Sequence, residues 1–98
     1  MVNFEWDERK NQSNQKKHGV SFEEAVTVFF DPNQLSIPDI VHSEDEERWV
    51  TIGMSKKLKT LVVIHLSLTD RSAQTIRVIS ARKADKEERT QYATSAET

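Results

Sequence analysis

The residues best suited to chemistry lie in the second half of the chain, in a segment rich in basic side chains. His65 stands in one apolar run, and Arg77 and Arg82 stand in the next. The planar guanidinium of arginine donates two hydrogen bonds to a phosphate and stays charged. The imidazole of histidine exchanges a proton near neutral pH, because its unperturbed pKa is about 6.5. Together these groups could bind a phosphodiester and assist its cleavage.

Cleavage of an RNA phosphodiester needs few parts. One group assists loss of the ribose 2′-OH proton, another stabilises the charge of the phosphorane-like transition state, and a third protonates the leaving 5′-oxygen. This route requires no metal ion. The alternative is that a lone strand histidine is structural and that exposed strand arginines only keep the protein soluble, and residue types alone leave both interpretations open.

The formal net charge of -2 at pH 7, taken alone, argues weakly against nucleic-acid binding. The charges are unevenly placed, however. Residues 31–47 contain six acids and no Lys or Arg, whereas residues 48–83 contain eight bases and one acid. The basic segment could form a surface for phosphate, and the acidic segment could meet a different partner. The alternative is that both are solvated loops and strand ends.

A second polar set lies near the N-terminus, in a predicted helix. Lys10, Asn14 and Lys17 are spaced i, i+4, i+7 and fall on one helix face, and His18 follows them. This face could be the wall of an RNA groove, with Lys17 or His18 near the phosphate. It could equally be a solvated face whose cations lie near the negative end of the helix dipole.

Several kinds of site are excluded by absent residues. The sequence has no cysteine, so it holds no disulfide and no thiolate metal site. His18, His42 and His65 lack the spacing of metal ligands, and two glycines cannot make a Gly-rich phosphate loop. No apolar run approaches the roughly 20 residues that cross a bilayer, and the N-terminus lacks a signal-peptide pattern. We therefore expect no cofactor, no metal ion and no membrane contact, and a cytoplasmic location is permitted.

The elements that must position these residues follow from local patterns. Capping signals predict a helix over 8–18, between Asp7 and Gly19, and another from Phe22 to Phe30 after the capping box of Ser21 and Glu24. Strands are predicted near Phe4, over 35–40 at a sheet edge, and over 48–55, 59–69 and 74–83. A third helix is predicted over 84–92, and residues 93–98 are expected to fray.

This order predicts one α+β domain over residues 1–98, with a short N-terminal strand and two helices packed on an antiparallel sheet. The last helix is expected beside the other, more open face. Alternation divides the central strand into two sides, and the side predicted to meet the helices consists of Val62, Ile64, Leu66 and Leu68. Ile76 and Val78 of the next strand are predicted to lie on the same side. Alternation places His65 and Arg77 together on the open face. Arg82 reaches that face only if its strand ends or bulges before it.

Separated motifs, in order, resemble the BrnT family of toxins over residues 3 to 92. They include Phe4-Glu5-Trp6-Asp7, Lys10, Asn14, Lys17-His18-Gly19-Val20-Ser21-Phe22-Glu23-Glu24-Ala25, Asp31-Pro32, His42-Ser43, Glu47-Arg48, Ile52-Gly53, Leu61-Val62-Val63-Ile64-His65, Ile76-Arg77-Val78-Ile79-Ser80-Ala81-Arg82, Glu88-Arg89 and Tyr92. The resemblance implies a RelE-like fold and a metal-independent endoribonuclease that inhibits translation. It also implies a BrnA-type antitoxin with a ribbon-helix-helix domain, two toxins assembled around an antitoxin dimer, and autorepression in which only the antitoxin touches operator DNA.

Carried onto matching positions, the resemblance implies a catalytic set of His65, Arg77 and Arg82. Arg77 and Arg82 would hold the scissile phosphate, and His65 would transfer a proton. The RNA-binding positions would be Lys17, His18, Arg48 and Tyr92, and Tyr92 could stack on a base or assist proton transfer.

Two other functions stay open. The first is a catalytically inert RelE-like binding module that acts only as an antitoxin-bound co-repressor. The second is a soluble stress-response domain of unrelated function.

Overall fold

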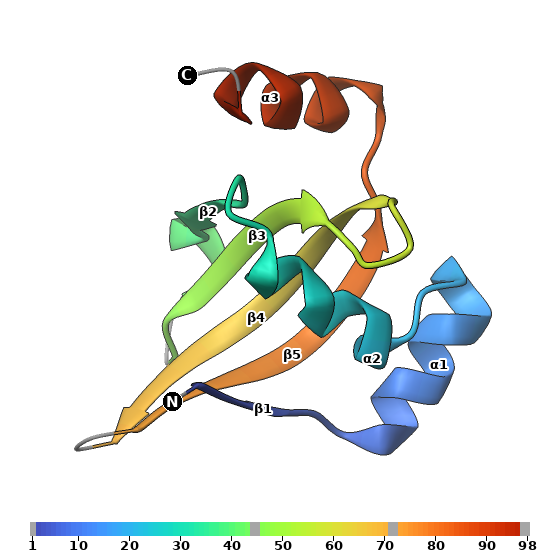
Figure 1. The fold of residues 1–98 in the computed structure, drawn as a ribbon. Helices are drawn as coiled ribbons and strands as arrows, with labels where there is room; N and C mark the ends of the chain where they lie inside the picture. The colour runs from blue at the N-terminus through green and yellow to red at the C-terminus, as the bar shows by residue number, and fades with distance from the viewer. Residues whose placement is uncertain (1, 44–45, 71–72, 97–98) are drawn as a thin grey trace.

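The computed structural model describes residues 2–43, 46–70 and 73–96, and it contains one five-stranded sheet in the order β1-β5-β4-β3-β2. The strands are β1 (Val2–Glu5), β2 (Leu35–Pro38), β3 (Arg48–Met54), β4 (Thr60–Asp70) and β5 (Ala73–Lys83). The helices are α1 (Glu8–His18), α2 (Phe22–Ala25) and α3 (Lys86–Ala96), with 3-10 turns η1 (Val26–Phe30) and η2 (Ile40–His42). In Figure 1, α2 and η1 lie across the sheet, whereas α3 lies at the opposite end from α1.

The predicted elements are confirmed, with small changes at their ends. β2, β3, β4 and β5 form an antiparallel set, and β2 is an edge strand, as Pro38 predicted. β1 adds to the other edge of the sheet, where it pairs parallel with β5. The second predicted helix divides into α2 and the tighter turn η1.

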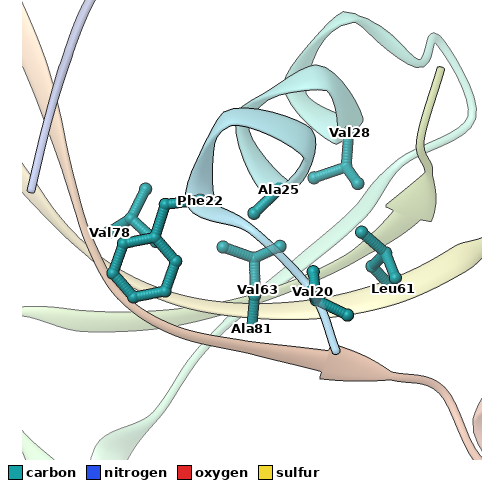
Figure 2. Packing of buried hydrophobic residues seen from close by; sticks show 8 residues of the cluster. All are labelled: Val20, Phe22, Ala25, Val28, Leu61, Val63, Val78 and Ala81. Atoms are coloured by element: carbon teal, nitrogen blue, oxygen red, sulfur yellow. The ribbon is translucent and has the colours of Figure 1, made fainter. Parts of the chain in front are cut away.

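The main core lies between β4, β5 and the segment Val20–Val28. Phe22, Ala25 and Val28 point onto Leu61, Val63, Val78 and Ala81, and all of these side chains are fully or almost fully buried (Figure 2). Burying each large apolar side chain contributes on the order of 2 kcal/mol. This cluster fixes which face of β4 meets α2 and η1.

That face is the opposite of the predicted one. Leu61 and Val63 meet the early helices, whereas Val62 belongs to a second cluster, in which Ile64 and Tyr92 also pack. The prediction failed because β4 is apolar on both sides, as expected of a central strand covered on both faces. Alternation alone could not show which side the early helices cover.

β5 contains a bulge that changes its facing part-way along. Val78 pairs with His65, but Ser80 pairs with Ile64, so Ile79 is an extra residue. The bulge returns Arg82 to the same face as Arg77, because Arg82 pairs with Val62 and Arg77 pairs with Leu66. Arg82 was expected to reach this face only if its strand ended or bulged before it, and the bulge is present.

α1 is attached to the sheet by buried amides rather than by an apolar stripe. The Nδ2 of Asn14 donates to the carbonyls of Val20 and Ala81 at 2.9 and 2.8 Å, and its Oδ1 accepts from the amide of Ala81 at 3.2 Å. The Oδ1 of Asn11 accepts from the amide of Phe22 at 2.8 Å. The bonds to Ala81 satisfy backbone groups of β5 beyond the point where β1 ends, and the others satisfy backbone groups of the segment that follows α1.

α3 begins with a reciprocal cap. The amide of Glu88 donates to Asp85 Oδ1, and the amide of Asp85 donates to Glu88 Oε1. The helix continues to Ala96, so residues 93–96, which were expected to fray, extend it; residues 97–98 lie outside the described residues. Among the described residues, no helix is both long and apolar enough to span a membrane.

Candidate nucleic-acid interface

A row of charged residues crosses the sheet on the face away from α2. Arg48 of β3 pairs with Leu66 of β4, Leu66 pairs with Arg77 of β5, and Arg77 pairs with Glu5 of β1. Laterally paired residues project to the same face of a sheet. The register therefore places two guanidinium groups on either side of Leu66.

A hollow of about 530 Å³ lies over this row, outside the part of the face that α3 covers. Its lining residues are Lys10, Val41, His42, Glu46, Arg48, Leu66, Arg77 and Ile79. Its lining combines three apolar residues with four basic ones and one acid. Such a combination suits a nucleotide, whose phosphate is charged and whose base is flat and apolar on its faces.

A second hollow, of about 230 Å³, runs between α1 and β5. Its lining residues are Lys10, Ser13, Asn14, Lys17, His18, Ile79 and Ser80. Lys10 and Ile79 line both hollows, so the two lie next to each other. We call the two hollows together the basic groove, and its basic side chains are Lys10, Lys17, His18, His42, Arg48 and Arg77.

The two arginines of the groove differ in their contacts. Arg77 donates to Glu5 Oε2 at 2.5 Å, which holds the guanidinium at the outer side of the row. The Nε of Arg48 is buried and has no hydrogen-bond partner among the described residues. An unsatisfied donor raises the free energy of the folded state, and an acceptor that reaches it would recover part of this energy. The terminal nitrogens of Arg48 form no hydrogen bond with any described residue, so these donors are the ones available to a phosphate oxygen.

His65 does not lie in the groove, and the prediction that it shares a face with Arg77 is wrong. It is 5% exposed and packs edge-on against Phe29, with ring centroids 4.8 Å apart. Its Nε2 lies 2.7 Å from Thr51 Oγ1, which in turn lies 2.6 Å from Ser36 Oγ. Burial lowers the pKa of His65 to about 4, so the ring is neutral at physiological pH. The structure makes His65 a core residue of the helix-covered face.

Arg82 shares the face of Arg77 but does not join it. Their pairing partners Val62 and Leu66 are four residues apart on β4, which is about 13 Å along a strand. Both terminal nitrogens of Arg82 donate to the carboxylate of Glu88, at 2.7 and 2.8 Å. This bidentate bond raises the pKa of Arg82 and occupies the fork that a phosphate would use.

Tyr92 is also engaged elsewhere. Its hydroxyl donates to Asp31 Oδ2 at 2.5 Å, and its ring packs in the cluster beneath α3. Burial and the carboxylate of Asp31 together raise the pKa of Tyr92 to about 12, so it holds its proton at neutral pH. Arg82 and Tyr92 attach α3 to the sheet.

Comparison with known proteins identifies the family. The model of a family described as the ribonuclease toxin BrnT of type II toxin-antitoxin systems matches residues 6–88. The chain belongs to the BrnT family. A 1.1 Å crystal structure of the Brucella abortus ribonuclease toxin BrnT is similar, with a TM-score of 0.66 and 25% sequence identity, covering 88% of this chain and 100% of that one. No curated protein sequence matches.

Within this member of the BrnT family, the structure brings together four predicted residues: Lys17, His18, Arg48 and Arg77. Sequence analysis missed the contribution of His42 and gave no individual role to Lys10. The signal for His42 was the i, i+3 spacing from Asp39, which allows a carboxylate to hold the ring. Of the acidic run at 44–47, Glu46 lines the groove and Glu47 is exposed, whereas Glu44 and Asp45 lie outside the described residues.

Proposed function

We propose that this chain is the toxin of a type II toxin-antitoxin system, and that it is an endoribonuclease that binds the RNA backbone in the basic groove. The observation that carries the proposal is the paired register of Arg48, Leu66 and Arg77, which holds two guanidinium groups over one hollow. A binding site for a phosphodiester requires fixed donors at the place where negative charge develops.

The chemistry follows from these positions. Arg77 and Arg48 bind the non-bridging oxygens of one phosphate, and Lys10 neutralises the charge of the adjacent phosphate in the RNA backbone. The ribose 2′-oxygen attacks phosphorus, the bond to the 5′-oxygen breaks, and the products are a 2′,3′-cyclic phosphate and a 5′-hydroxyl. The guanidinium groups stabilise the extra charge of the transition state, so the route needs no metal ion.

The predicted site changes accordingly. His65 is buried on the far side of the sheet, so we assign it to the core and not to proton transfer. Arg82 and Tyr92 are assigned to the attachment of α3. Lys17 and His18 keep their predicted role, because they line the part of the basic groove along which the RNA backbone would continue.

The family description supports an antitoxin partner. We propose that this partner is a BrnA-type ribbon-helix-helix protein, that two toxins assemble with an antitoxin dimer, and that the complex represses its own operon. Free toxin would cleave RNA in the cytoplasm and inhibit translation. The toxin itself would reach operator DNA only through the antitoxin.

The test is an RNA cleavage assay with the purified protein and a doubly substituted variant, Arg48→Ala with Arg77→Ala. We expect the wild-type protein to cleave RNA without added metal, in the presence of a chelator, and the variant to lose at least 100-fold in rate. Lys59→Ala is the matched control, since it removes one exposed cation outside the groove. Circular dichroism verifies that each variant is folded.

Two outcomes would overturn the proposal. A folded wild-type chain that binds RNA but leaves it intact would favour the inert co-repressor. Equal rates for the wild-type and doubly substituted proteins would remove the basic groove from the mechanism. Induction in cells with and without the antitoxin gene separates the same alternatives, because only an active nuclease arrests growth when it is expressed alone.

A further inference from the structure

His42 lies at the rim of the hollow that holds Arg48 and Arg77, and a carboxylate orients its ring. It is the last residue of η2, and its Nδ1 lies 2.9 and 3.1 Å from the two oxygens of Asp39. A carboxylate accepts the Nδ1 proton and so leaves the lone pair on Nε2. In the described part of the chain, no residue forms a hydrogen bond with that Nε2.

The segment that carries this pair is fixed to the start of β3. The amide of Asp39 donates to the carbonyl of Arg48 at 2.7 Å. The hydroxyl of Ser43 donates to the carbonyl of Asp39 at 2.6 Å and accepts from the amide of Arg48 at 2.9 Å. The backbone that positions the imidazole is therefore bonded to the residue that supplies one of the two phosphate-binding guanidinium groups.

The surroundings of His42 leave its ring open to a substrate. Among the described residues, the carboxylate of Asp39 contacts the ring, and Glu46 lines the same hollow. Lys10, Arg48 and Arg77 line the same hollow and would hold the phosphate there. The side chain is 64% exposed, whereas that of Asp39 is 20% exposed. A substrate can reach the imidazole while the carboxylate behind it stays shielded.

We propose that His42 is the proton-transfer residue of the ribonuclease and that Asp39 is its positioning residue; this inference rests on the proposed function. His42 Nε2 takes the proton of the ribose 2′-hydroxyl while the 2′-oxygen forms its bond to phosphorus. The bond from phosphorus to the 5′-oxygen breaks, and that oxygen takes a proton from water. The hydroxide left behind accepts the proton from His42, so the enzyme returns to its starting state.

The experiment compares His42→Gln with the wild-type protein on a short RNA of fixed sequence. Glutamine keeps a polar side chain but cannot relay a proton at neutral pH. Because positioned general acid–base groups contribute 10²–10⁴-fold, we expect the cleavage rate to fall by at least about 100-fold. The RNA dissociation constant, measured with a 2′-deoxy substitution at the cleaved position, should change less than about threefold.

Two further variants separate chemistry from structure. Asp39→Asn should lower the rate by about tenfold and leave affinity unchanged, because the ring loses the carboxylate that holds the Nδ1 proton and so orients Nε2. His42→Ala should regain activity on addition of free imidazole, which a purely structural role would not allow. His65→Leu is the matched histidine control, and we expect it to retain the wild-type rate.

The outcomes distinguish the two proposals. Wild-type protein that does not cleave RNA overturns the proposed function and this inference together. Wild-type protein that cleaves, beside a folded His42→Gln variant that cleaves at the same rate, overturns only the role of His42. Recovery of the cleavage rate of His42→Ala on addition of free imidazole supports it.

Discussion

His65 and Arg77 belong to adjacent strands but project to opposite faces of the sheet. The hairpin register pairs His65 with Val78, so Arg77 lies beside Leu66 instead. The imidazole therefore packs under Phe29, and the guanidinium lies over the open hollow. This separation removes the pair from any shared mechanism and assigns each residue a different role.

The buried state of His65 predicts how stability depends on pH. Its pKa is about 4 in the folded chain and near 6.5 when unfolded, so between these values only the unfolded chain binds the proton. The free energy of unfolding should therefore fall as the pH is lowered from about 6.5 through 4, by up to about 3 kcal/mol. Urea unfolding of the wild-type protein and His65→Leu, at pH 7 and pH 4.5, measures this contribution.

The quantity to compare is the change in the free energy of unfolding between the two pH values, in the wild-type protein and in His65→Leu. Asp31 and Glu88 also have lowered pKa values, and their contributions to stability are lost at still lower pH in both proteins, so they cancel in this comparison. For Asp31, burial raises the pKa, but hydrogen bonds from Tyr92, Met54 and Asn33 outweigh this effect. Identical pH dependence in wild-type protein and His65→Leu would show that His65 is not buried as a neutral ring.

The two arginines of β5 should differ in their effect on the salt dependence of RNA binding. Each phosphate contact contributes about 0.7 to the slope of log affinity against log salt for a single strand. We expect Arg77→Ala to reduce the slope by about this amount. Arg82→Ala should leave it unchanged, because Glu88 already occupies that guanidinium. Equal reductions would mean that RNA displaces Glu88 and that the groove extends toward α3.

The polar attachment of α1 predicts an unusually sensitive asparagine. Asn14→Ala leaves the carbonyls of Val20 and Ala81 and the amide of Ala81 without their partner. We expect a loss of about 2–3 kcal/mol in the free energy of unfolding. Chemical denaturation measures the loss, and Gln12→Ala, at an exposed position of the same helix, is the control. A change below 0.5 kcal/mol would contradict the assignment of Asn14 as the anchor of α1.

Tyr92 offers a direct spectroscopic test of the attachment of α3, because it is the one tyrosine in the sequence. Its phenol should ionise with a pKa near 12 rather than 10, as followed by ultraviolet absorbance while circular dichroism reports a folded protein. Asp31→Asn should lower this pKa toward 10, because it removes the negative charge beside the hydroxyl. A pKa near 10 in the wild-type protein would mean that α3 does not dock in this way.

The sequence predicted the order of elements well, because their ends are marked by local chemistry. Asp7 and Gly19 bound α1, Ser21 caps α2, and Pro38 marks an edge strand. These signals act over a few residues and do not depend on the rest of the fold. The capping box of Asp85 and Glu88 was equally local and would have supported the start of α3.

The candidate site was harder to predict, since it depends on long-range pairing. Arg77 was placed on the correct face because β5 alternates clearly there, but β4 is apolar on both sides and gave no such guide for His65. Asn14 was grouped with Lys10 and Lys17 as part of a polar face, although its amide is buried against β5. His42 lies in an irregular segment, where neither strand nor helix periodicity applies.

The extra residue at Ile79 has a consequence for comparing and redesigning related chains. Arg77 and Arg82 are an odd number of positions apart, yet both project outward, which a regular strand would forbid. Deleting Ile79 would make Val78 and Ser80 consecutive paired residues, so β5 would become a regular strand with Arg82 still outward and Ala81 still inward. A related chain that is one residue shorter at this point can therefore keep both arginines on the outward face, four positions apart instead of five.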